Sequence, residues 1–137
     1  MEHFMVESPA RAMFERDEAS RRLGMTLVES TPGYALVRMA VRDDMIQGHG
    51  TCHGGFVFAL ADSALAFACN GYDFTAVAAN CSIDFLAPVR LGDTLTATAR
   101  EQARAGRTGV YDVAVTNQQG TVVALFRGRS RQVGDAK

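Results

Sequence analysis

The residues best suited to chemistry lie in one stretch, GHGTCHGGFVFALADSALAFACN, which runs from Gly48 to Asn70. Its only carboxylate, Asp62, stands with Ser63 inside an otherwise apolar run from Phe56 to Cys69. An ionised carboxylate that is removed from water without a partner is costly, so such residues tend to have a function. Asp62 is therefore a candidate general base or nucleophile, and the elements around it must hold it in place.

The apolar run predicts a buried helix. It is too short to cross a bilayer, which takes about 20 apolar residues, and too long for an ordinary strand. We expect a helix of roughly four turns. Because it is apolar on every side, the rest of the chain must enclose it on every side.

Length and composition indicate one domain. The 137 residues are enough to bury a single core, and no linker, repeat or low-complexity segment marks a second domain. A net charge of −1 gives no argument for a nucleic-acid partner. The three cysteines lack CxxC spacing, which favours reduced thiols, and the acidic N-terminus has no continuous apolar segment typical of a secretory signal. We expect a cytoplasmic protein with no membrane partner.

The rest of the chain predicts one further helix and six strands. Ser8 and Pro9 suit a helix start and Gly24 a helix end, so residues 1–24 form a helical lead-in. Alternating apolar residues between turn signals predict strands at Leu27–Val28, Tyr34–Val41, Thr75–Leu86, Thr94–Arg100, Val110–Thr116 and Thr121–Ser130. The residues Ala105-Gly106-Arg107 are expected to form a flexible link.

Short connections between consecutive strands require a mostly antiparallel sheet, because a parallel crossover needs about a dozen residues. The fold class is therefore α+β, with an antiparallel sheet of about five to six strands wrapped around a long central helix.

This architecture and the central motif together resemble the hotdog-fold thioesterases, and within them the phenylacetate-degradation thioesterase family. The downstream blocks VAANCSIDFLAPVRLGDTLTATA, TGVYDVAVTNQQG and TVVALFRGRSR are similar to that family as well. The likeness covers the chain from about Met25 onward. It implies a single hotdog domain over residues 1–137 that hydrolyses acyl-CoA thioesters, with aryl-acetyl groups such as phenylacetyl or hydroxyphenylacetyl preferred, and that uses no cofactor.

Thioester hydrolysis needs a polarised carbonyl and an activated water or a nucleophile. The start of a helix offers unpaired N–H groups and the positive end of the dipole, so we expect the Gly55 N–H to stabilise the oxyanion. Gly54 and Phe56 would contact the substrate. Asp62, as base or nucleophile, lies about 10 Å further along the axis, too far to act on the same carbonyl within one subunit. The resemblance implies a homodimer with composite sites, and often a homotetramer.

Two further candidates flank the helix start. Gln47 lies where the family commonly has an asparagine that positions water or the thioester. His53 either bonds the thioester carbonyl or braces the loop that presents the Gly55 N–H. At the mouth of the site, Arg127 and Arg129 are candidates for the CoA phosphates by charge alone.

Other chemistries are weaker. A nucleophilic Cys52 beside His53 lacks a third group, and the histidines, cysteines and Asp62 form no recognised metal spacing, so we predict no metal. Two alternatives stay open. One is a hotdog acyl-thioester hydratase or dehydratase, and the other is a non-catalytic acyl-CoA-binding module.

Overall fold

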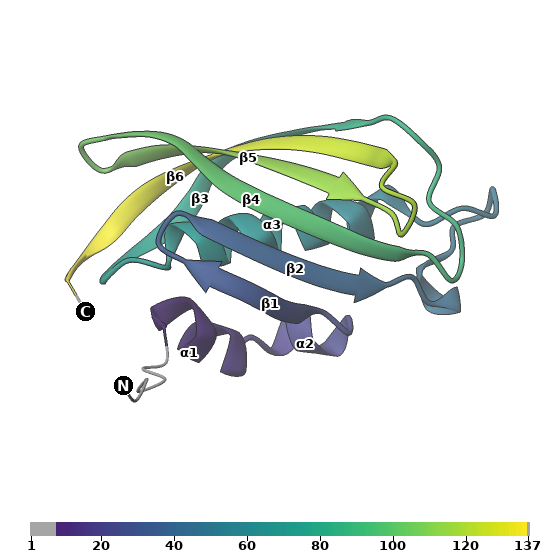
Figure 1. Cartoon of the computed structure of the whole chain (residues 1–137), viewed down its shortest axis with the longest axis horizontal. Helices are drawn as coiled ribbons and strands as arrows, with labels where there is room; N and C mark the ends of the chain where they lie inside the picture. Colours follow the sequence, from purple (N-terminus) through teal and green to yellow (C-terminus); the bar gives the residue numbers. More distant parts are fainter. Residues whose placement is uncertain (1–7, 137) are drawn as a thin grey trace.

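A computed structural model describes residues 8–136 and shows a six-stranded antiparallel sheet laid over the long helix α3 (Figure 1). The strand order is β1-β2-β4-β5-β6-β3, and every neighbouring pair is antiparallel. The predicted fold class and the six strands are confirmed. The elements are α1 (Pro9–Glu15), α2 (Glu18–Arg22), β1 (Thr26–Thr31), β2 (Tyr34–Ala40), a short 3₁₀ turn (Asp43–Met45), α3 (Gly54–Cys69), β3 (Phe74–Phe85), β4 (Thr94–Ala105), β5 (Thr108–Thr116) and β6 (Val122–Ala136).

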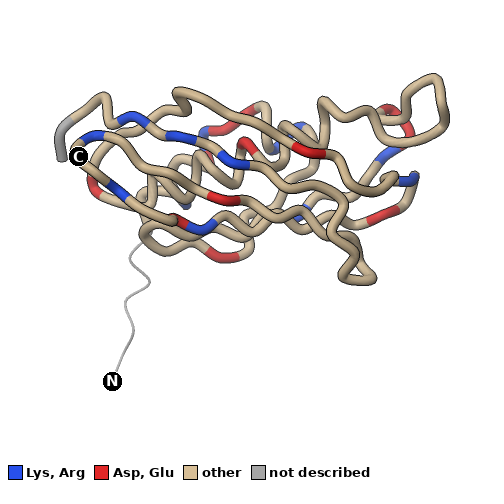
Figure 2. The backbone as a smooth tube through the Cα atoms, turned by 90° about the horizontal axis from the view of Figure 1, so that it is seen from above, with Lys and Arg blue, Asp and Glu red and all other residues tan. Residues whose placement is uncertain are grey.

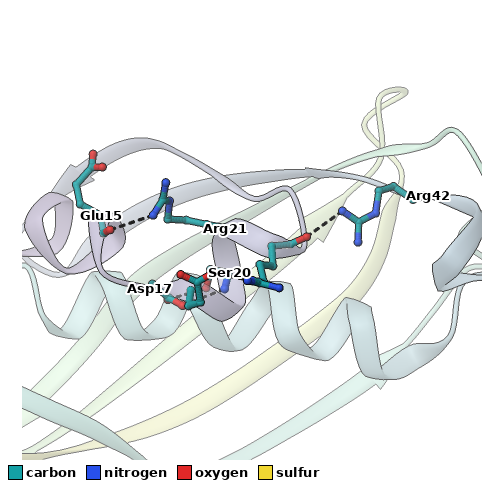
Figure 3. Close-up of polar contacts among 7 residues, drawn as sticks. Glu15, Asp17, Ser20, Arg21 and Arg42 are labelled. Atoms are coloured by element: carbon teal, nitrogen blue, oxygen red, sulfur yellow. Dashed lines mark hydrogen bonds and ion pairs between the residues drawn. The ribbon is translucent and has the colours of Figure 1, made fainter.

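The predicted single N-terminal helix is wrong, because two short helices replace it. Ser8 caps α1 by accepting the Arg11 N–H at 3.0 Å, as expected, but Asp17 then caps a second helix by accepting the Ser20 N–H at 2.9 Å. The Ser20 hydroxyl also donates to Asp17 at 2.7 Å (Figure 3). The buried Ser20 contacts Ser63 of α3 as well, where the two hydroxyl oxygens lie 2.8 Å apart. The first seven residues of the predicted lead-in lie outside the described residues.

The predicted flexible link after β4 is also wrong, because it is a tight hairpin turn. β4 continues to Ala105, and β5 begins at Thr108 directly opposite it. Gly106 has a φ of +60°, a conformation that glycine adopts without steric cost. The glycine that suggested a flexible link in the sequence instead allows the chain to reverse direction between two paired strands.

Helix α3 packs against the sheet through apolar residues. Where β6 meets the helix, Gly128 has no side chain, and a Cβ there would lie 2.5 Å from Leu65 Cδ2. On another side α1 covers the helix through an edge-to-face contact of Phe14 with Phe67, whose ring centroids are 5.7 Å apart. No helix within residues 8–136 has both the length and the apolar character needed to span a membrane.

The prediction that the chain encloses α3 on every side is wrong for one flank. Gly55 is exposed, and Phe58, Ala59, Asp62 and Ala66 are only half-buried. The spacing of three and four residues places these side chains on one stripe of the helix. The stripe stays open because β3, the neighbouring strand, is the last strand of the sheet and nothing within the described residues pairs with its outer edge.

Candidate active site

The start of α3 is fixed by the residues that precede it. The Cys52 N–H donates to the Val89 carbonyl at 2.7 Å, and the His53 N–H donates to the Met45 carbonyl at 2.8 Å. His53 is the N-cap residue, and its Nδ1 accepts the N–H of Gly55 at 2.9 Å. The helix therefore begins at Gly54, two residues before the predicted apolar run.

The two glycine N–H groups at this helix start differ. The Gly55 N–H, the predicted oxyanion donor, is bonded to the imidazole of His53. The Gly54 N–H has no hydrogen-bond acceptor within residues 8–136. Of these two N–H groups, only that of Gly54 lacks an acceptor among the described residues, and the hydrogen bond of His53 to the Gly55 N–H braces the helix start.

The two glycines also make room for two rings. A Cβ at Gly55 would lie 3.1 Å from His53 Nδ1, so a side chain there would crowd the capping imidazole. A Cβ at Gly54 would lie 3.0 Å from Cζ of Phe85, the last residue of β3. Sequence reasoning did not select Phe85, because 31 residues separate it from Gly54 and only the fold brings them together.

Asp62 lies on the open flank of α3, eight residues after Gly54, which is about 12 Å along the helix axis. Its carboxylate makes no hydrogen bond or ion pair with any described residue. Burial raises the pKa of Asp62. Burial also raises the pKa of the Cys81 thiol on β3, and the nearby charge of Asp62 raises it further. A carboxylate that is half-desolvated and unpartnered is suited to accept a proton or to attack a carbon.

Gln47 braces the loop before the helix. Its Nε2 donates to Thr51 Oγ1 at 2.8 Å, and its Oε1 accepts the His49 N–H at 2.7 Å. Both ends of the carboxamide are therefore engaged within the loop. Phe56 is half-buried and lies edge-on to His53, with ring centroids 6.2 Å apart.

The structure does not bring Arg127 and Arg129 to the helix start of the same subunit. Both are exposed on β6, where they alternate with the buried Phe126 and Ser130, so they lie on the face of the sheet opposite α3. Arg127 forms two hydrogen bonds with Asp112, at 2.6 and 2.8 Å. Basic residues are more frequent toward the end of the molecule that carries the C-terminus (Figure 2).

Cys52 has the properties of an inert thiol. Burial and the charge of Asp93 raise its pKa, and its Sγ contacts the His53 carbonyl, at 3.5 Å. A nucleophilic cysteine needs the opposite shift. No group of three or more histidine, cysteine, aspartate or glutamate residues within residues 8–136 is placed to hold a metal ion.

Comparison with known proteins gives consistent relatives. A family model described as "Thioesterase superfamily" matches residues 49–124. The chain is 49% identical to the acyl-coenzyme A thioesterase PaaI of Escherichia coli, over 91% of this chain and 89% of that protein. The structure of E. coli PaaI, from the phenylacetic acid degradation operon, superposes with a TM-score of 0.91 at 48% identity and covers 93% of both chains. A Streptococcus mutans protein bound to acetyl CoA superposes with a TM-score of 0.75 at 31% identity, over 82% of this chain and 91% of that one.

Proposed function

The chain belongs to the thioesterase superfamily, and we propose that it hydrolyses aryl-acetyl thioesters of CoA, such as phenylacetyl-CoA or hydroxyphenylacetyl-CoA, to the free acid and CoA. Its activity as an acyl-CoA thioesterase rests on one observation, the 49% sequence identity to the E. coli acyl-CoA thioesterase over 91% of this chain. The operon of that relative supports the choice of an aryl-acetyl group. The acetyl CoA bound to the S. mutans protein supports CoA thioesters as the class of ligand.

The helix start supplies the electrophilic half of the reaction. In the proposed mechanism the thioester carbonyl accepts the open Gly54 N–H at the positive end of the α3 dipole. Negative charge that develops on this oxygen is stabilised there, and one such donor is typically worth about 3 to 4 kcal/mol. The Gly55 N–H, the oxyanion donor predicted from sequence, is bonded to His53 in this structure, so its role as that donor stays a prediction.

Asp62 supplies the nucleophilic half. As a base it takes a proton from water while the water oxygen bonds to the acyl carbon, and the C–S bond then breaks to release the CoA thiolate, which is protonated. As a nucleophile it forms an acyl-aspartate that water hydrolyses in a second step. The raised pKa of Asp62 suits the first route, and its lack of a partner suits both.

We propose that the active unit is a homodimer. The 12 Å of helix between Gly54 and Asp62 prevents both from acting on one carbonyl within a subunit. Two features support a second copy. Within residues 8–136, no strand pairs with the outer edge of β3, a 12-residue strand that exposes Val77 (48%), and the flank of α3 that carries Asp62 is left only half-buried beside it. Strand edges of this length pair readily with another chain.

The remaining expectations stay proposals. A homotetramer would need a second contact surface, and the outer face of the sheet carries a groove of about 510 Å³ that Arg127 helps to line. In such an assembly Arg127 and Arg129 would meet CoA phosphates bound at another subunit. The cytoplasmic location stays a prediction from sequence.

The test is thiol release from phenylacetyl-CoA, a ring-hydroxylated analogue and a straight-chain acyl-CoA. We expect the aryl substrates to be preferred and the Asp62→Asn variant to lose at least about a hundredfold in kcat. Asp84→Asn is the matched control, because Asp84 is an exposed carboxylate of β3 on the face of the sheet that points away from α3. Binding without thiol release would instead favour an acyl-CoA sensor, and an active Asp62→Asn enzyme would refute the mechanism.

A further inference from the structure

Phe85 is an exposed aromatic ring held against the start of α3. It ends β3, and its side chain is 55% exposed although it packs on Gly54, where three ring atoms lie 3.0 to 3.5 Å from the position of a Cβ. An alternating strand places it on the α3 side of the sheet, opposite Asp84 and Ser82. The ring is thus fixed on one face and open to solvent on the other.

A hollow adjoins this ring. Its volume is about 330 Å³, and it is lined by Thr51 and Cys52 before the helix, by Phe85 at the end of β3 and by residues 86–89 after it. Most of these side chains are apolar, as is usual for small-ligand sites. The ring of Phe85 thus lines the hollow and also packs on Gly54.

Because the ring packs on Gly54, a ligand held on the N–H of that residue comes close to the ring. The acyl carbon is one bond away from the carbonyl oxygen, so the first atoms of the acyl group come within reach of the ring. Aromatic rings pair with other rings in edge-to-face or offset geometry and gain about 0.5–1.5 kcal/mol beyond the area they bury. A straight alkyl chain gains only the area.

We propose that Phe85 is a specificity-determining residue, whose ring packs on the acyl group and favours aryl over straight-chain thioesters. This inference rests on the proposed function, since it takes the Gly54 N–H as the donor to the thioester. It assigns no role in bond making or breaking to Phe85. Gly54 has a second task in this arrangement, because a Cβ there would crowd the ring and require it to move by a few tenths of an ångström.

The experiment compares kcat/KM for phenylacetyl-CoA and hexanoyl-CoA in the wild type, Phe85→Leu and Phe85→Tyr. We expect Phe85→Leu to lower the aryl-to-alkyl ratio roughly 2- to 12-fold, the size of an aromatic pair contribution, and Phe85→Tyr to keep the ratio within about twofold. Tyr34→Leu is the matched control, because it removes a half-buried ring on β2, which is separated from β3 by three strands. Inhibition by free CoA should not change in any variant.

Several results would overturn the proposal. If Phe85→Leu slows both substrates equally, or weakens inhibition by free CoA, the ring contacts the pantetheine arm and not the acyl group. An unchanged ratio removes Phe85 from specificity altogether. If the wild type releases no thiol from either substrate, the proposed function fails first, and the same ratio is then measured from the dissociation constants of the two acyl-CoAs by calorimetry.

Discussion

The bond between the Gly55 N–H and His53 determines which nitrogen of the imidazole carries the proton. A backbone N–H can only donate, so Nδ1 must be unprotonated and the neutral ring must carry its proton on Nε2. No described residue accepts that Nε2–H, and the side chain is exposed. We therefore predict two separable roles for His53, as a cap of α3 and as a donor toward the thioester.

The two roles have different magnitudes. Loss of an N-cap side chain costs about 1 kcal/mol, which in a chain of this length corresponds to a fall of about 4 °C in melting temperature. Loss of one hydrogen-bond donor at a buried oxyanion site lowers kcat about a hundredfold to a thousandfold. Because His53 is exposed and water competes for its proton, we expect about a tenfold loss.

A substitution series separates cap from donor. His53→Ala should lose both stability and activity, whereas His53→Ser should recover the melting temperature, since serine caps helices well, but not kcat/KM. His53→Asn offers an acceptor and a donor together and should recover part of the activity. Nitrogen-15 spectra of the wild type should show an unprotonated Nδ1 and a protonated Nε2.

The assay is thermal unfolding and thiol release on the same preparations. A serine variant as active as the wild type would show that His53 only caps the helix. An alanine variant with an unchanged melting temperature would refute the cap itself. A spectrum with the proton on Nδ1 would refute the geometry from which both roles are argued.

Three further predictions concern stability and assembly. Burial raises the pKa of Asp62, so the wild type becomes less stable as pH rises through that pKa and the buried side chain ionises. In a series of thermal melts, Asp62→Asn should therefore melt at a higher temperature than the wild type at pH 7. This difference should vanish below pH 3.8, the ordinary pKa of aspartate. Glu101 accepts the hydroxyls of Tyr72 and the fully buried Tyr111, at 2.9 and 3.0 Å, so Glu101→Leu should cost about 1–3 kcal/mol in denaturant unfolding while Glu101→Gln, which keeps an acceptor, should cost less. Ala79→Lys places a charge at the exposed middle of β3, where two antiparallel copies would meet, so sedimentation should show a weakened dimer with reduced activity, and a fully active monomer would exclude the composite site.

Sequence patterns predicted the elements that depend on local periodicity. The apolar run predicted α3 to within two residues of its start, because a long run of apolar residues is a local pattern that identifies a buried helix without information on its tertiary contacts. The alternation in Thr94–Arg100 predicted β4 for a similar reason. The break at Asp17 was missed, although an aspartate three residues before Ser20 is itself a capping signal.

Sequence patterns selected the residue types of the candidate site, whose catalytic roles stay predictions, but they did not predict the contacts of these residues. Asp62 and the two glycines follow from the motif, whereas the bond from Gly55 to His53 depends on the rotamer of a loop side chain. The face occupied by Arg127 and Arg129 could have been predicted, because Phe126 and Gly128 alternate with them and mark the side toward the helix. Charge alone was the weaker guide.

The open flank of α3 and the proposed reactivity of Asp62 have the same physical cause. A chain that completed the enclosure of its own helix would bury the carboxylate without a partner, at a cost that favours the neutral acid and closes the path of the substrate. A fully exposed flank would leave the carboxylate hydrated and a poorer base. In the proposed dimer the second copy supplies the missing cover and also brings its own helix start to face Asp62, so desolvation and access to the thioester arise together on assembly. The pKa of Asp62 should therefore rise further when the dimer forms, and a titration of Asp62 that is the same in the wild type and in a monomeric Ala79→Lys variant would contradict the proposed dimer site.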